Sequence, residues 1–368
     1  MGNKIKIGFV STYPPTVSGL SRYADELSDY LNSYYDDMRV EKISVLKNKW
    51  YKEIDSVCIS DYDIIVYNIG NHPMNQKTFD YALRYPSIVV LHEYDISSLK
   101  VKSFLSKMIK SNPLERLINA GNCFIVHSKL AKDKLSSLRA MTFKVNEFYF
   151  SRKNTSMEKR KNSIGIFGFI SKSKGANEIL ESFKKYKKNG GSVNIFFAGD
   201  TADFSLKDEL IKRNLDSDIV FYKNPSDGEF DSLMESCIGA INLRTRESGE
   251  TSANMLKLFS LGKCVAMNSQ PSIDSQLKDC YYSIDSDSYV SSLMKFFYAI
   301  EKNEKVISRI AENALKAVKN AYSIEKVTVE WHEIFKQGRK IKKYSAKIKV
   351  NKVRELGNWI LSFIGRLK

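Results

Sequence analysis

Residues 241–265, INLRTRESGETSANMLKLFSLGKCV, join an apolar segment of strand length to an amphipathic helix through a short polar loop. The apolar run over 237–243 predicts a buried strand. The polar segment 244–250 contains Gly249, and apolar side chains at helical spacing then predict a helix over 251–261. Because strand, loop and helix in this order form the repeating unit of a parallel α/β sheet, the stretch predicts the fold class.

The loop in this stretch has the chemistry of an anion-binding site. Thr251 or Ser252 can cap the helix, which leaves the backbone N–H groups of its first turn, including that of Ala253, facing the loop. The positive end of the helix dipole points the same way, and Arg244 and Arg246 add full positive charges. A diphosphate would fit there, although these residues are equally compatible with an ordinary capped loop that binds no ligand.

The same alternation extends along the chain and predicts two domains. In the first half, apolar runs that predict strands cover residues 5–10, 64–67, 88–91 and 123–126. The polar stretch 151–162, SRKNTSMEKRKN, then reads as a linker. After it, strands are predicted over residues 164–169, 193–198 and 219–222. They alternate with predicted helices that begin at residue 176 and lie near residues 206–213 and 229–236. We therefore expect two doubly wound domains, over residues 1–150 and 163–321.

Composition agrees with a two-domain protein of the cytoplasm. The chain has 368 residues, of which 43% are hydrophobic, enough to fill two cores. Its five cysteines are scattered singly, which indicates buried thiols in a reducing compartment instead of a disulfide framework or a zinc site. The N-terminal apolar run, 7–10, is too short for a signal peptide, and no apolar segment reaches membrane-spanning length.

Together these motifs resemble the family-four nucleotide-sugar glycosyltransferases. The sequence N-L-R, followed by G-E-T-S, a helix and G-K, is similar to the second-domain signature of a branch in which G-E-T-S replaces the usual acidic loop. Residues 4–31, KIKIGFVSTYPPTVSGLSRYADELSDYL, resemble the opening strand, glycine loop and first helix of the family. Segments 125–130, IVHSKL, and 164–183, IGIFGFISKSKGANEILESF, also match. The resemblance implies the GT-B fold, in which two Rossmann-like domains face each other across a cleft, with a crossover helix over 322–337.

The resemblance also implies an activity: transfer of a sugar from a nucleotide-diphosphate sugar to a hydroxyl acceptor, with retention of anomeric configuration. In the first domain it implies donor contacts from the loop tip Ser18, Gly19 and Leu20. His92, which follows a predicted strand, matches the family histidine that contacts the donor sugar. His127 also ends a strand, but there the residues favour a structural role, with His127 or Ser128 capping the next helix.

In the second domain the resemblance implies that Lys174 neutralises the leaving diphosphate, with Lys172 as a neighbouring alternative. The remaining donor-binding residues implied by the motif are Arg244, Gly249, Thr251, Ser252 and Ala253, with Glu250 as a catalytic carboxylate that reaches the sugar or ribose.

The sequence departs from the family pattern at three positions. Phe169 stands where many relatives carry an arginine. Gly249 and Lys257 occupy the places of the two glutamates that most of the family carry, and a lysine cannot accept hydrogen bonds from ribose as a carboxylate does. The alternative function is therefore a catalytically inactive relative that serves as a nucleotide-binding or scaffolding subunit.

The resemblance implies neither a metal nor a cofactor, because basic residues and helix dipoles take the place of a bound cation. The triplet D-Y-D at residues 61–63 precedes a predicted strand, and we interpret it as a chance match to a metal-binding motif in a turn.

The end of the chain carries much of the positive charge. Residues 338–368 contain ten Lys or Arg against one acidic residue, a net +9 of the formal +16 of the whole chain. Apolar residues recur there at near-helical spacing, and Trp359 with Phe363 fits an amphipathic helix on an anionic membrane. We therefore expect a peripheral protein of the inner membrane face with a glycan or lipid-linked acceptor. A helix packed on a partner subunit or on the protein itself is the alternative. No recognition element for nucleic acid is identifiable.

Overall fold

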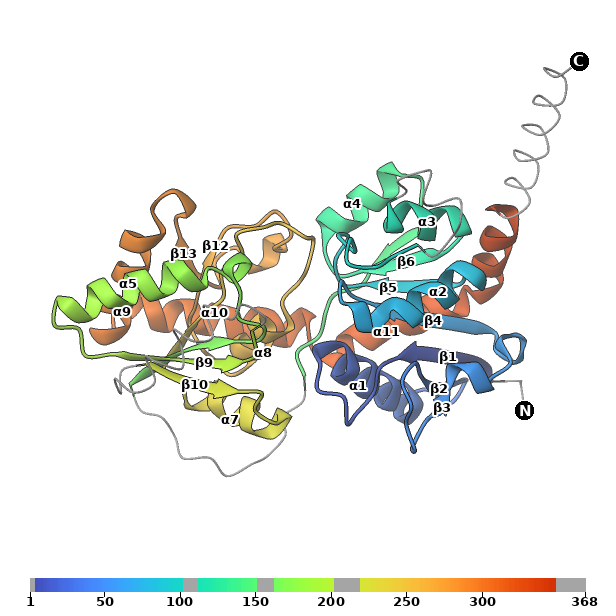
Figure 1. Cartoon of the computed structure of the whole chain (residues 1–368), viewed down its shortest axis with the longest axis horizontal. Helices are drawn as coiled ribbons and strands as arrows, with labels where there is room; N and C mark the ends of the chain where they lie inside the picture. The colour runs from blue at the N-terminus through green and yellow to red at the C-terminus, as the bar shows by residue number, and fades with distance from the viewer. Residues whose placement is uncertain (1–3, 102–111, 151–161, 202–218, 349–368) are drawn as a thin grey trace, which may run out of the picture. The chain divides into compact units, whose positions relative to one another are not determined.

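The structure is a computed structural model and describes residues 4–101, 112–150, 162–201 and 219–348. The chain forms two compact units, each built on one sheet of parallel strands (Figure 1). Unit 1 comprises Met1–Asn146, Ser248–Thr251 and Val327–Lys368, and unit 2 comprises Glu147–Glu247 and Ser252–Lys326. Most of the expected linker, 151–162, lies outside the described residues.

Unit 1 contains a seven-stranded sheet in the order β3-β2-β1-β4-β5-β6-β7, with every neighbouring pair parallel. The strands are β1 (Ile5–Ser11), β2 (Met38–Ser44), β3 (Lys52–Glu53), β4 (Ile64–Ile69), β5 (Ile88–Leu91), β6 (Cys123–Val126) and β7 (Thr142–Lys144). The apolar runs predicted β1, β4, β5 and β6. They did not predict β2, in which charged residues interrupt the apolar ones, or the short edge strands β3 and β7.

Helices cover both faces of this sheet. On one face α1 (Gly19–Tyr34) lies beside α11 (Ile324–Lys336), where the rings of Tyr35 and His332 stack with centroids 4.1 Å apart. Trp331 of α11 is fully buried, and its ring lies 6.2 Å from that of Phe9 in β1. The other face packs against α2 (Gln76–Arg84), α3 (Pro113–Ala120) and α4 (Lys129–Ser137), in a core that includes Val10.

Unit 2 repeats the plan with six parallel strands in the order β10-β9-β8-β11-β12-β13. The strands are β8 (Ser163–Phe167), β9 (Asn194–Gly199), β10 (Ile219–Lys223), β11 (Gly239–Ile241), β12 (Val265–Asn268) and β13 (Tyr282–Ile284). One face packs against α5 (Ala176–Lys188) and α9 (Tyr289–Glu301), and the other against α7 (Asp227–Ser236), α8 (Ala253–Ser260) and α10 (Lys305–Ala321). The predicted helix near 206–213 lies outside the described residues. The prediction of two doubly wound α/β domains is confirmed.

The cysteines follow the prediction except at one position. All five are free thiols, and Cys123, Cys237, Cys264 and Cys280 are buried, whereas Cys58 is exposed. Burial raises the pKa of Cys123 to about 12, because a thiolate would lose its hydration there. Such buried thiols are unreactive.

The basic segment that begins at residue 338 starts as part of unit 1. Residues 338–348 are helical, and Ile341 is 1% exposed. Ser345 donates a hydrogen bond from Oγ to the carbonyl of Gly121 at 2.7 Å, and the backbone N–H of Met141 donates to the hydroxyl of Tyr344 at 3.2 Å. The apolar side of this segment therefore packs on the protein instead of facing a membrane. The rest of the expected tail, 349–368, lies outside the described residues.

Along residues 4–101, 112–150, 162–201 and 219–348, no helix is both long and apolar enough to cross a membrane.

We predict that two truncations will differ in their effect on stability. Removing residues 338–368 exposes the surface that Ile341 covers and deletes the Ser345 hydrogen bond, so the free energy of unfolding should fall by about 2–4 kcal/mol. Removing only residues 349–368 leaves Ile341 and the Ser345 hydrogen bond in place, so it should cost less. Urea denaturation measures both, and equal stability of the two truncated proteins would contradict the packing role of 338–348.

Candidate functional site

In unit 2, a lysine and an asparagine converge on a glycine at the carboxyl end of β8. Gly168 has φ +102°, and a Cβ atom there would lie 2.9 Å from Nδ2 of Asn254 and 3.5 Å from Nζ of Lys174. Asn254 is the second residue of α8. The Lys174 ammonium group therefore lies at the N-terminus of this helix, where backbone N–H groups and the helix dipole favour an anion.

Ser252 caps this helix, which settles the choice that the sequence left open. Its hydroxyl accepts from the backbone N–H of Met255 at 3.4 Å and from Nδ2 of Asn242 at 2.9 Å. The other end of the Asn242 amide accepts from Nη1 of Arg244 at 2.9 Å. A continuous chain of hydrogen bonds thus connects the Arg244 guanidinium group to the start of α8.

A backbone contact ties the lysine segment to the arginine loop. The N–H of Thr245 donates to the carbonyl of Ser173 at 2.8 Å, between the two lysines of the 3₁₀ turn Lys172–Lys174. Lys172 is exposed, whereas Lys174 is half-buried. Of the two lysines that the sequence offered, Lys174 is the one placed beside α8. The predicted residues Lys174, Arg244, Ser252 and Ala253 are therefore brought together in unit 2.

The middle of the G-E-T-S motif groups with unit 1. The backbone N–H of Tyr94 donates to the carbonyl of Ser248 at 3.0 Å, and Oγ of Ser128 donates to the carbonyl of Gly249 at 2.9 Å. A Cβ atom on Gly249, which has φ +76°, would lie 2.5 Å from the Tyr94 ring, so only glycine fits. Thr251 donates from Oγ1 to the carbonyl of His127 at 3.2 Å. Gly249 and Thr251 thus make packing contacts within unit 1.

His92 lies directly after β5, at the carboxyl edge of the unit 1 sheet. Its Nε2 is 2.7 Å from Oδ1 of Asn68, and its ring contacts that of Tyr23, with centroids 4.8 Å apart. Burial lowers the pKa of His92 to about 4, although the negative charge of Glu250 acts in the opposite direction. His92 is therefore a neutral hydrogen-bonding group at physiological pH, and Glu250 belongs to its surroundings.

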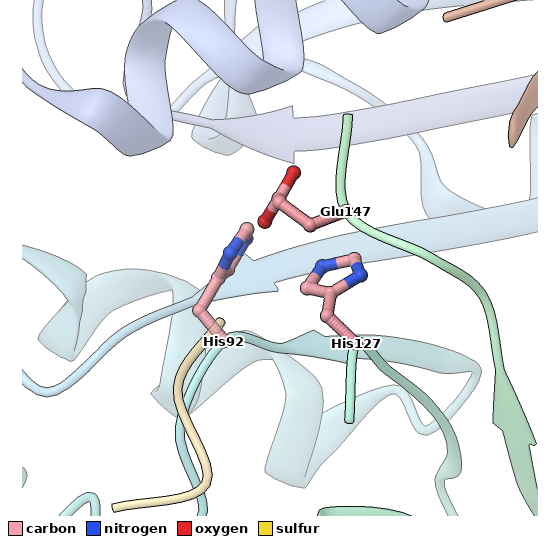
Figure 2. Close-up of side chains that lie close together, drawn as sticks. All are labelled: His92, His127 and Glu147. Atoms are coloured by element: carbon pink, nitrogen blue, oxygen red, sulfur yellow. The ribbon is translucent and has the colours of Figure 1, made fainter. Parts of the chain in front are cut away.

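Figure 2 shows the side chains of His92, His127 and Glu147 pointing toward one another. One potential ligand atom from each lies within 4.8 Å of the others. Glu147 is the first residue of unit 2 and directly follows Asn146, the last residue of the first segment of unit 1. Two residues before it, the backbone N–H of Val145 donates to the carbonyl of Val126 in β6. Two imidazoles and a carboxylate are the donor set that could hold a divalent ion such as zinc. The sequence did not predict this grouping.

The first loop of unit 1 combines a helix cap with an open position. Ser18 caps α1, because its hydroxyl accepts from the backbone N–H of Ser21 at 3.1 Å. A Cβ atom at Gly19 would have no neighbour within 4 Å, so nothing in the described chain requires glycine there. Leu20 packs its side chain against Gly70, and its carbonyl accepts from Asn68.

Lys257, which the resemblance aligns with a glutamate, faces the interior of unit 2. It is 4% exposed, and its Nζ donates to the carbonyl of Phe150 at 2.9 Å and lies 3.6 Å from Oδ2 of Asp231. Such a buried charge pair is structural, and removing one partner is strongly destabilising. Lys257 thus stabilises unit 2 and takes no part in the candidate site.

The structure also shows where Phe169 and the D-Y-D triplet lie. Phe169 is an exposed side chain, 52% accessible, in the loop after β8. Asp63 of the D-Y-D triplet accepts from the backbone N–H of Lys6, at the amino end of β1 and thus at the edge of the sheet opposite His92.

Besides Glu147, two residues of the candidate site, Asn254 and Asn68, were missed from the sequence. Asn254 lies between apolar helix positions and carries no motif signal beyond its place in the first turn. Asn68 lies inside an apolar strand run, and a buried polar residue in such a run is the signal that could have identified it.

Several solved structures have a fold similar to that of this chain. A glycosyltransferase from Rickettsia africae is similar over 92% of this chain and 100% of its own, with TM-score 0.64 and 14% identity. HepE from Anabaena, in complex with UDP-glucose, covers 90% of this chain and 99% of its own, with TM-score 0.63 and 15% identity. An α-glucosyltransferase in complex with UDP-glucose and DNA covers 91% and 100%, with TM-score 0.61 and 13% identity.

No family model matches the chain, and no curated protein sequence matches it. Sequence identities of this size establish the architecture alone. The chain has the two-domain α/β fold of these glycosyltransferase structures.

We predict that Lys174→Ala and Arg244→Ala will each weaken the binding of a nucleoside diphosphate by roughly 10- to 100-fold, the effect of losing a hydrogen bond to a charged group. Both side chains place positive charge near the first turn of α8. Lys172→Ala serves as the matched control, because this exposed neighbour should change the dissociation constant less than threefold. Titration calorimetry measures the three variants. Unchanged affinity in both test variants would show that the diphosphate does not bind there.

Proposed function

We propose that the protein is a glycosyltransferase that transfers a sugar from a nucleotide-diphosphate sugar to a hydroxyl of a glycan or lipid-linked acceptor. The observation that carries the proposal is the convergence of Lys174, Asn254 and the N-terminus of α8 at Gly168. Together with the fold, this arrangement suits the diphosphate of such a donor. The complexes of HepE and of the DNA-bound α-glucosyltransferase with UDP-glucose make UDP-glucose the first donor to test.

The proposed reaction retains the configuration of the anomeric carbon. The bond from that carbon to the diphosphate oxygen breaks, a bond to the acceptor oxygen forms, and the proton of the acceptor hydroxyl passes to the leaving diphosphate. Positive charge from Lys174 and Arg244 would stabilise the leaving diphosphate, so the proposed chemistry calls on no metal and no cofactor. His92 is proposed to contact the donor sugar, and Glu250 to act in its vicinity.

We predict that His92→Ala will lower the turnover number at least tenfold while changing nucleoside diphosphate affinity less than threefold, because the histidine is assigned to the sugar. His332→Ala is the matched control. That histidine pairs with Asp37 on the surface of unit 1 and should leave turnover unchanged.

The assay measures transfer and hydrolysis with a panel of nucleotide sugars, in the presence and absence of a chelator. Binding of nucleotides without transfer or hydrolysis of any donor would favour the inactive scaffold instead. Loss of activity with the chelator would overturn the metal-independent chemistry and would point to the cluster of His92, His127 and Glu147.

We propose further that the basic C-terminal segment binds the protein to an anionic membrane surface. Within 338–348, the side turned away from unit 1 carries five exposed cations, which are Arg339, Lys340, Lys342, Lys343 and Lys347. The sequence beyond it adds five more, together with Trp359 and Phe363. Each cation near such a surface contributes about 1 kcal/mol, so the two groups together would hold the protein at physiological salt.

We predict that removing 349–368 will abolish the salt-resistant part of binding to anionic vesicles, because the apolar anchors are lost, while weaker salt-sensitive binding remains. Lys342→Glu with Lys343→Glu should then remove the remainder without loss of stability, since both side chains are exposed. Co-sedimentation at low and high salt measures these effects. Full salt-resistant binding by the truncated protein would rule out the tail as the anchor.

A further inference from the structure

Asn68 is a fully buried asparagine in the middle of the candidate site of unit 1. It belongs to β4 and pairs in register with Val90 of β5, so its backbone is fixed by the sheet. Its side chain contacts the ends of three other elements: Ser11 of β1, Leu20 of α1 and His92 after β5. An amide with no access to water must satisfy its donors and its acceptor inside the protein, which makes its orientation specific.

The partners of Asn68 determine which way its amide points. Nδ2 lies 3.0 Å from the carbonyl oxygen of Leu20, which can only accept, and 3.0 Å from Oγ of Ser11. The amide nitrogen must therefore face Leu20, and Oδ1 must face His92. Because an amide oxygen cannot donate, the 2.7 Å contact requires that the imidazole carry its hydrogen on Nε2.

The neighbouring histidine is fixed in the opposite form. Nδ1 of His127 lies 3.0 Å from the carbonyl oxygen of Val145, so its hydrogen is on Nδ1. The two rings lie with centroids 4.9 Å apart, and the ring of Tyr23 contacts both. The residue that orients His92, Asn68, therefore belongs to β4, and the residue that orients His127, Val145, directly follows β7.

We propose that Asn68 is the positioning residue for His92: it holds the imidazole in the Nε2–H form and fixes the orientation of the ring at the place assigned to the donor sugar. The assignment to a sugar rests on the proposed function, whereas the fixed tautomer does not. Charged and titratable groups that face His92 in the described part of the chain include Glu250, His127, Tyr23 and Glu147.

The first test is the tautomer of His92 in the full-length protein. The chain has four histidines, so nitrogen NMR of ¹⁵N-histidine-labelled protein resolves each ring, and His92→Gln assigns the signal. We expect a single form with the hydrogen on Nε2. A mixture of tautomers, or a hydrogen on Nδ1, would overturn the proposal whether or not the protein transfers sugar.

The second test compares two buried asparagines. Asn68→Ala should release His92 into a mixture of tautomers and lower the turnover number about 10- to 100-fold with a smaller change in KM. The matched control is Asn122→Ala, which removes an equally buried amide with three hydrogen bonds, to Ser87, Ala82 and Leu117.

The control variant should lose stability but keep the His92 tautomer and the turnover number. Two outcomes would contradict the positioning role of Asn68. One is a single Nε2–H form of His92 that persists in Asn68→Ala, and the other is an equal loss of turnover in Asn122→Ala. A fixed tautomer in a protein that transfers no sugar would instead refute the proposed function and leave the role of Asn68 intact.

Discussion

Parallel pairing of strands is the constraint on which the rest of this structure depends. When neighbouring strands run in the same direction, their carboxyl ends lie at one edge of the sheet, and the loops that follow them meet there. In unit 1, β1 and β4 are neighbours although α1 and two strands separate them in the chain. Asn68 at the end of β4 can therefore reach Ser11 and Leu20, and His92 at the end of β5 can reach Asn68. In unit 2 the same rule brings Gly168, after β8, to the start of α8.

The two units use this edge for different chemistry. Unit 2 offers positive charge: a lysine, an arginine connected by hydrogen bonds to a helix cap, and the first turn of α8. Unit 1 offers neutral hydrogen-bonding groups, because burial keeps His92 uncharged and an amide orients it. Under the proposed function, the positive charge of unit 2 would stabilise a leaving diphosphate, and the oriented neutral groups of unit 1 would suit an uncharged sugar.

One position where the sequence departs from the family it resembles has a physical explanation. Lys257, which the resemblance aligns with a glutamate, turns inward and is compensated by Asp231 and a backbone carbonyl. The start of the basic C-terminal segment, residues 338–348, has two roles. It buries Ile341 within unit 1 and leaves its cations exposed, so it contributes to folding and to surface charge at the same time. A helix that presents two faces can do both.

The sequence by itself determined the fold class, because apolar runs of strand length alternate with helical patterns over both halves of the chain. The resemblance offered Lys174, Arg244 and His92 as candidates, supported by the charge of the first two and by the position of His92 after a predicted strand. Only the tertiary structure decided that Ser252 caps α8, that Gly249 and Thr251 pack on unit 1, and that Asn68 and Asn254 belong to the site. These facts depend on contacts between residues far apart in the chain, and the hydrophobic pattern of a strand does not record which side chain its one polar residue meets.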